Sequence, residues 1–214
     1  MKRLIVFCTV GLLTWLPSAY AATMDEAIAT LQQQWAIIKY QTPDQERQEK
    51  AIAMLADQAA QVRQSYPGKA ETLIWQAIIV STQAGIDGGI TALGEEKQAR
   101  DLLLEAEKIN PQALNGSVYT SLGSLYYKAF GWPVGFGDNK QAKEYLEKAL
   151  AINPDGIDPN FFYGELLYET GDYAKAKSVL EHGLNAPPRP GRELADKGRR
   201  EEIRELLQKV NKKL

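Results

Sequence analysis

Apolar side chains recur along the chain at intervals of three and four residues, which places them on one face of an α-helix. The first such face is formed by Met24, Ala27, Ile28, Leu31, Trp35 and Ile38. Thr23 directly precedes this stretch, and Glu26 lies three residues later, which is the spacing of a capping box. No stretch alternates between polar and apolar residues in the way that a half-buried strand does. The pattern therefore predicts an all-α protein.

Turn and cap residues divide the periodic pattern into about nine predicted helices. Thr42 and Pro43 are expected to open the second one, because a hydroxyl cap followed by proline is typical of a helix start. A third helix is predicted over about 69–84. The remaining predicted helices lie near residues 95–109, 115–129, 138–152, 158–170, 173–186 and 193–211.

The second half of the chain repeats itself at a fixed spacing. Three pairs of identical residues have the same separation: Ala142 and Ala176, Leu146 and Leu180, and Pro154 and Pro188. This period, about 34 residues, is typical of a helix–turn–helix unit that stacks on its neighbours to bury its apolar face.

Two motifs carry a resemblance to the tetratricopeptide repeat family. Tyr119-x-x-Leu122-Gly123-x-x-Tyr126 resembles the first helix of that repeat, and the stretch 171–176, Gly-Asp-Tyr-Ala-Lys-Ala, resembles its turn into the second helix. The resemblance implies a solenoid of helical hairpins in antiparallel pairs. It is best over residues 116–188, and the charged amphipathic segment 192–211 is expected to be a capping helix.

The resemblance also implies packing and binding roles. Ala142 and Ala176 are expected to be buried where the two helices of a unit meet. A protein or peptide partner is expected along the concave face of the first helices. The candidate face of the best-matched units consists of Ser117, Thr120, Ser124, Tyr127, Lys128, Asp158, Phe161, Glu165, Tyr168 and Glu169. It is aromatic and acidic, so it favours a basic or apolar segment and not the carboxylate that some members of the family clamp.

Seven residues are extra relative to the family spacing, around residues 128–138. This insertion holds Phe130, Trp132 and Phe136. We expect the three rings to form one cluster near Tyr126 and to border a partner site. A related long turn is predicted over residues 85–94, projecting from the same edge. The candidate partner-binding residues are thus Tyr127, Phe130, Trp132, Phe136, Phe161, Glu165 and Tyr168.

Residues 1–21 resemble a secretory signal more than a part of the fold. A basic start, Lys2 and Arg3, is followed by an apolar run over residues 4–16 and by small residues at Ala19 and Ala21. The run is shorter than the roughly 20 residues that span a bilayer. We therefore predict cleavage after Ala21, with an uncleaved anchor as the alternative.

Cleavage would leave residues 22–214 as a single repeat domain with no Cys. That composition suits an oxidising compartment, with the periplasm expected first and secretion second. Removing two basic residues and no acidic ones changes the formal net charge from −2 to −4. A chain of this charge does not have the basic surface that binding to nucleic acid requires.

One Cys and one His in the whole chain exclude zinc sites of Cys and His and most nucleophilic catalysis. No phosphate-binding or dinucleotide-binding glycine motif is present. We expect no enzyme activity, cofactor or metal. The sequence therefore predicts a periplasmic binding or scaffold protein with a protein or peptide partner. The alternative is a solute-binding accessory component of a tripartite (TRAP-type) transporter, whose helical-repeat component has a similar architecture.

Overall fold

The structure, a computed structural model, describes residues 22–214 and confirms the all-α prediction there. The described residues form α1 (Met24–Gln41), α2 (Gln45–Ser65), α3 (Ala70–Asp87), α4 (Gly89–Ile109), α5 (Ala113–Lys128), α6 (Asn139–Ile152), α7 (Ile157–Glu169), α8 (Tyr173–Leu184) and α9 (Glu193–Asn211). The predicted signal segment, residues 1–21, lies outside the described residues. Among the helices described, none is long and apolar enough to cross a membrane.

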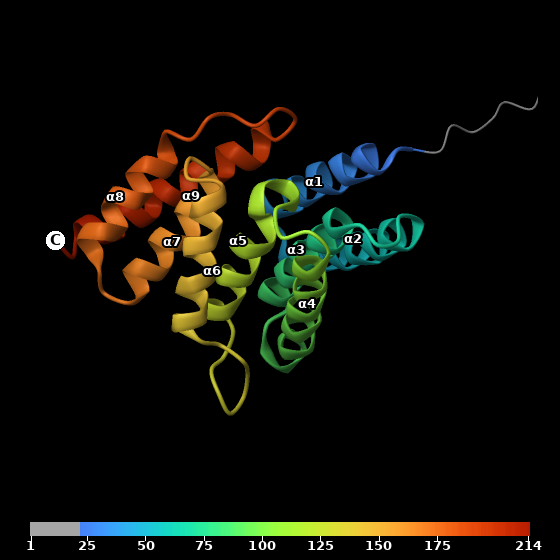
Figure 1. The fold of residues 1–214 in the computed structure, drawn as a ribbon, viewed down its shortest axis with the longest axis horizontal. Coiled ribbons are helices and arrows are strands. Elements are labelled where there is room, and N and C mark those ends of the chain that lie inside the picture. The colour runs from blue at the N-terminus through green and yellow to red at the C-terminus, as the bar shows by residue number, and fades with distance from the viewer. Residues whose placement is uncertain (1–21) are drawn as a thin grey trace, which may run out of the picture.

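The helices pack in adjacent antiparallel pairs, which gives a TPR-like arrangement. Helix α3 packs on α4, α5 on α6 and α7 on α8, while the odd-numbered helices contact one another in a row from α1 to α9 (Figure 1). Helix α9 also contacts α1. The two ends of the row therefore meet, and the inner side of the solenoid is closed by the chain itself.

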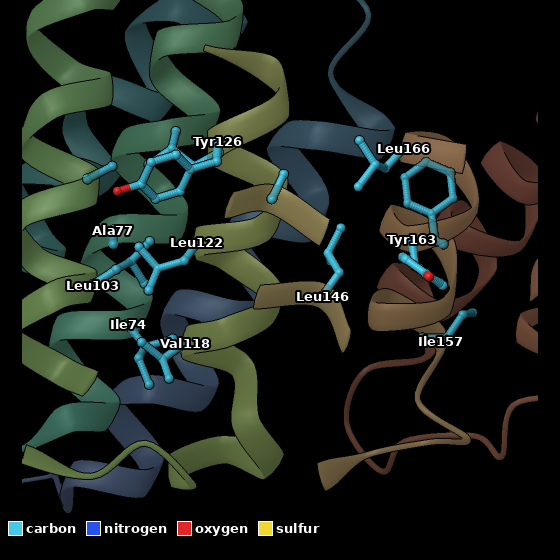
Figure 2. Packing of buried hydrophobic residues seen from close by; sticks show 14 of the residues in the cluster. Ile74, Ala77, Leu103, Val118, Leu122, Tyr126, Leu146, Ile157, Tyr163 and Leu166 are labelled. Carbon is cyan, nitrogen blue, oxygen red and sulfur yellow. The ribbon is translucent and has the colours of Figure 1, made fainter. Parts of the chain in front are cut away.

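Small residues at the predicted positions let the paired helices approach closely. Ala142 and Ala176 are both fully buried, which confirms the predicted register. A Cβ atom added to Gly123 would lie 2.5 Å from Leu146 Cγ, so only glycine fits at this crossing. Figure 2 shows part of the resulting apolar core, in which Leu122 and Leu146 belong to the same cluster of buried residues.

The first helix starts as predicted, whereas the start of the second is shifted. Thr23 and Glu26 form the predicted capping box. The second helix begins two residues later than expected, because the side chain of Asp44, and not that of Thr42, caps it by accepting a hydrogen bond from the Arg47 amide (2.9 Å). A carboxylate is at least as good a cap as a hydroxyl, and its negative charge also suits the helix N-terminus.

The predicted long turn over residues 85–94 is wrong. Helix α3 continues to Asp87 and α4 begins at Gly89, so the connection shrinks to Gly88. Gly88 and Gly89 have φ values of 64° and 63°, which side chains disfavour and glycine adopts readily. Two such residues reverse the chain without a loop.

Candidate functional site

The inserted segment forms a closed loop between α5 and α6, the α5–α6 loop (residues 129–138). At its base the Gly137 amide donates a hydrogen bond to the Phe130 carbonyl oxygen (2.8 Å). The Asp138 amide donates to the Tyr126 carbonyl oxygen at the same distance, 2.8 Å. These bonds tie the end of the loop to its beginning and to the last turn of α5.

Glycines in this loop serve close approach of the backbone. A Cβ atom on Gly135 would lie 2.2 Å from the Phe130 carbonyl oxygen, and one on Gly137 would lie 2.1 Å from that of Ala129. Both distances are far inside van der Waals contact, so a side chain at either position would force the loop open. The glycines therefore fix one tight conformation of the loop.

Phe136 anchors the loop to the helices. Its ring packs edge-on against Tyr126, with 5.4 Å between the ring centroids, and the Arg100 guanidinium of α4 lies 4.6 Å from its centroid. Tyr126 in turn stacks on Tyr145 of α6 at 5.6 Å. This part of the predicted aromatic cluster is confirmed.

The other two rings of the insertion do not join that cluster. Trp132 is 89% exposed, Phe130 is 60% exposed, and the neighbouring Val134 is 56% exposed. The prediction of one three-ring cluster is therefore wrong. Because the backbone bonds close the loop at its base, the tip between them projects beyond the helices, where those side chains have no apolar surface to cover.

Tyr127, Lys128 and Glu165 meet on the inner side of the solenoid. The Tyr127 hydroxyl donates to the Glu165 carboxylate, and the Lys128 ammonium lies 2.9 Å from the same group. Burial tends to raise the pKa of Glu165, but Lys128 and Tyr127 outweigh it and hold the pKa below its ordinary value. Burial, reinforced by Glu165, raises the pKa of Tyr127 well above its usual range.

Asp158, at the start of α7, is held by two arginines from the C-terminal segment. It lies 2.6 Å from Arg189 and 2.9 Å from Arg199. Burial opposes ionisation of Asp158, yet the two guanidinium groups hold its pKa well below the ordinary range. Arg199 also lies 4.3 Å from the ring centroid of Phe161, which is 5% exposed beneath it.

The remaining candidate, Tyr168, is half-buried and packs on Tyr173 of α8, with 5.7 Å between the ring centroids. The candidate residues thus divide into two sets. Tyr127, Phe136, Phe161, Glu165 and Tyr168 contact other parts of the same chain, whereas Phe130 and Trp132 face solvent.

Helices α1 and α9 supply inner-face residues that sequence reasoning missed. The Lys39 ammonium lies 3.1 Å from the Glu202 carboxylate, and the Tyr40 hydroxyl donates to the same group (3.2 Å). Gly198 leaves room for the Tyr40 ring, since a Cβ there would lie 2.4 Å from it. Burial, helped by the charge of Arg199 and opposed by Glu202, lowers the pKa of Lys39 to about 8. No local motif could reveal these residues, because they meet only when the row of helices closes.

Comparison with known proteins agrees with this architecture. Residues 134–197 match the tetratricopeptide repeat family. The fold is similar to that of TTC0263, a thermophilic TPR protein of Thermus thermophilus, with a TM-score of 0.57 and 16% identity over 86% of this chain and 92% of that chain.

Two further solved structures show a weaker similarity. MamA gives a TM-score of 0.43 and 18% identity over 79% of this chain and 92% of that chain. The pilF protein of Pseudomonas aeruginosa gives a TM-score of 0.36 and 18% identity over 89% of this chain and 91% of that chain. No curated protein sequence matches the chain.

The helical pairs of residues 22–214 therefore have a TPR-like fold, and residues 134–197 match the tetratricopeptide repeat family. Such repeats typically serve as non-enzymatic scaffolds that bind other proteins.

Proposed function

We propose that this protein is an exported, periplasmic scaffold that binds a protein or peptide partner through the tip of the α5–α6 loop. The observation that carries the proposal is Trp132, which is 89% exposed on a backbone fixed by hydrogen bonds and close glycine contacts. Tryptophan is enriched among the residues that dominate binding energy at interfaces. A loop that is already ordered loses little conformational entropy when a partner covers it.

The inner face offers less to a partner, although the family commonly binds there. Asp158 and Glu165 already have cationic partners within the chain, and Phe161 lies beneath Arg199. A peptide entering this face would have to separate these ion pairs, and Arg199, whose side chain is only 4% exposed beside Asp158, would be left without its partner. Binding at the loop requires no such opening.

A periplasmic location is supported by the sequence of residues 1–21, which has the layout of a secretory signal, and by the lack of Cys in residues 22–214. A scaffold is favoured over a solute binder by the polar lining of two cavities in residues 22–214. Their volumes are about 310 Å³ and 260 Å³, and each is lined by several charged or amide side chains. An apolar solute would meet little complementary surface in the larger one, which is lined by Asp138, Lys140, Gln141, Glu144, Tyr145 and Lys148.

Crosslinking in intact cells, followed by mass spectrometry, tests the proposal. Wild type should yield crosslinked protein partners, and Trp132→Ala should lose them. Met54→Ala is the matched control, because Met54 is also apolar and 74% exposed but lies on α2. Release of the protein by osmotic shock, with its first residue at Ala22, would support the location. Unchanged crosslinks in Trp132→Ala would refute the loop as the contact site.

A further inference from the structure

The connection between α4 and α5 is longer than its counterpart in the next unit. Gly123 is the twelfth residue after Pro111, whereas Gly164 is the tenth residue after Pro154. The two glycines occupy the same place in their units, because a Cβ atom on either would lie within 2.6 Å of a leucine on the paired helix. The connection from α4 to α5 therefore contains two extra residues.

The extra length is taken up by a left-handed stretch of backbone at the beginning of α5. Leu114, Asn115 and Gly116 have φ values of 50°, 56° and 73°. Residues with a Cβ atom disfavour this region, and left-handed residues ordinarily occur singly. Leu114 is 37% exposed, so little burial offsets the cost. Segment 114–116 is therefore strained, and such strain persists only where the surrounding structure imposes it.

The contact that closes the row of helices, the α1–α9 closure, is centred on polar groups. The Lys39 ammonium and the Tyr40 hydroxyl both reach the Glu202 carboxylate, at 3.1 and 3.2 Å, and the Tyr40 ring lies against Gly198. Burial, together with the charge of Arg199, outweighs the attraction of Glu202 and lowers the pKa of Lys39 to about 8. The closure therefore holds this ammonium less well than water does.

Helix α9 is bound more firmly on its other side. Ile203 and Val210 are fully buried in the core cluster that contains residues of α7 and α8. Toward α1, its contribution to the apolar cluster consists of Leu194 and Ala195, near its beginning. The α1–α9 closure is thus the weaker of the two contacts. Small and polar interfaces within a chain are those that allow relative motion.

The strained segment lies between the two helices that form the closure. Because α1 precedes segment 114–116 and α9 follows it, a change of backbone conformation there moves one helix relative to the other (Figure 1). Residues that absorb such a change act as a hinge. Leu103 of α4 and Leu122 of α5 belong to one buried cluster, which keeps the two parts joined beside the hinge (Figure 2).

We propose that the protein exchanges between this closed form and an open form, in which residues 22–110 swing away from residues 117–214 about segment 114–116 and the α1–α9 closure separates. In the closed form the closure imposes the left-handed backbone on Leu114. In the open form the segment relaxes and Lys39 returns to water. Opening uncovers the inner sides of α1 and α9. The inference goes beyond the proposed function, because the tip of the α5–α6 loop is exposed in both forms.

A distance measurement across the closure tests the exchange. Met54→Cys on α2 and Glu205→Cys on α9, both at exposed positions, accept nitroxide labels in the full chain with Cys8→Ser. Double electron–electron resonance then gives the distribution of label distances. The closed form contributes a shorter distance and the open form a longer one, and their areas give the ratio of open to closed molecules.

The first variants act on the closure. Gly198→Leu should raise the open-to-closed ratio, because a Cβ atom at this position would lie 2.4 Å from the Tyr40 ring. Adding Tyr40→Ala removes the clash and should restore the shorter distance. Lys197→Leu is the matched control, because it places the same side chain at an exposed position beside Gly198 and should leave the distribution unchanged.

The second variants act on the hinge without touching the closure. Leu114→Ile should raise the open population of the otherwise unchanged chain, because a β-branched residue tolerates positive φ less well. In the Gly198→Leu background, Leu114→Gly should lower the open-to-closed ratio about fivefold, because glycine adopts the left-handed conformation without the steric cost. Lys69→Ile is the control, since that residue lies in the α2–α3 connection with a φ of −103°.

Two outcomes would overturn the inference. One is a single, unchanged distance in all variants, which would mean that the closure does not open. The other is a longer distance in Gly198→Leu that the Leu114 variants leave unchanged, which would place the bend outside segment 114–116. If circular dichroism shows that Gly198→Leu is unfolded, Leu114→Ile decides alone, because it leaves α9 untouched. Either failure leaves the proposed function intact, since that is tested by the cellular crosslinks of Trp132→Ala.

Discussion

The inner face of the solenoid and the α5–α6 loop both contain aromatic residues in a setting that the sequence marks for binding. On the inner face, Phe161 lies beneath a guanidinium group and Asp158 is ion-paired. In the loop the polar backbone is hydrogen-bonded, while Trp132 has almost no contact with the rest of the chain. On the inner face the charged side chains have partners within the chain, whereas in the loop only the backbone groups do.

This difference shows that the composition of a face does not decide whether a partner can use it. Asp158 of α7 is paired with Arg199, which arrives from α9, beyond the next helix along the chain, and Glu165 is paired with Lys128 of α5. The loop has no such counterpart, because its base is closed and its tip projects beyond the helices. Exposed apolar area that the chain itself leaves uncovered is the stronger sign of a binding surface.

The largest effect on stability should come from removing an ion-pair partner on the inner face. Arg199→Ala should lower the free energy of unfolding by about 3 kcal/mol, measured by urea denaturation, because removing one member of a buried ion pair costs about 3–5 kcal/mol. We expect the lower end of this range because Asp158 would still be paired with Arg189, and Glu202 would still be paired with Lys39.

The control is Arg47→Ala, whose side chain is 85% exposed and should change stability by less than about 0.5 kcal/mol. If Arg199→Ala is as mild as this control, the inner face is not closed in solution, and the contrast between the two regions disappears.

Most of the fold follows from local pattern. The start of α6 was expected at residue 138 and occurs at Asn139, and the predicted burial of Ala142 is confirmed. Helical periodicity and small residues at repeat positions are local signals, and the family spacing fixes their register. The connection around Gly88 could not be read in this way, because two glycines at positive φ replace the loop that the spacing predicts.

The candidate site was less predictable for a different reason. The sequence located the insertion and its rings, but which ring packs depends on where the backbone closes, and the bond from Gly137 to Phe130 decides that. The contact of Lys39 with Glu202 depends on the path of the whole solenoid. Neither feature leaves a periodic trace in the sequence.

A moderate effect is expected where the loop meets the helices. Phe136→Ala should lower stability by about 1–2 kcal/mol, less than the roughly 3–5 kcal/mol of a fully buried Phe. Phe136 is only half-buried, and the loop can relax around the lost ring. Hydrogen exchange of the Gly137 and Asp138 amides should speed up at the same time. Unchanged exchange would show that the backbone bonds hold the loop without this anchor.

A smaller effect concerns pH. The pKa of Lys39 is about 8 in the folded protein, below its ordinary value of 10.5. Between pH 8 and 10 the unfolded chain holds a proton that the folded chain has released, so the Lys39 contribution to stability rises with pH. The raised pKa of Tyr40 acts in the opposite direction, but only above pH 10.

Lys39→Met should therefore flatten the rise in the free energy of unfolding across pH 8–10, measured by urea denaturation at several pH values. Lys50→Met is the control, because that side chain is 72% exposed on α2 and should leave the slope unchanged. Equal slopes in the wild type and Lys39→Met would show that the closure between α1 and α9 leaves this ammonium in water.

The smallest effect on stability should be at the tip of the loop. Trp132→Ala should change the free energy of unfolding by less than about 0.5 kcal/mol, because an 89% exposed ring loses almost no burial when it is removed. A loss above about 1 kcal/mol in urea denaturation would mean that Trp132 packs within its own chain, as the sequence first suggested. A stable variant that no longer binds would instead separate folding from recognition at one residue, since the ring would then matter only when another molecule covers it.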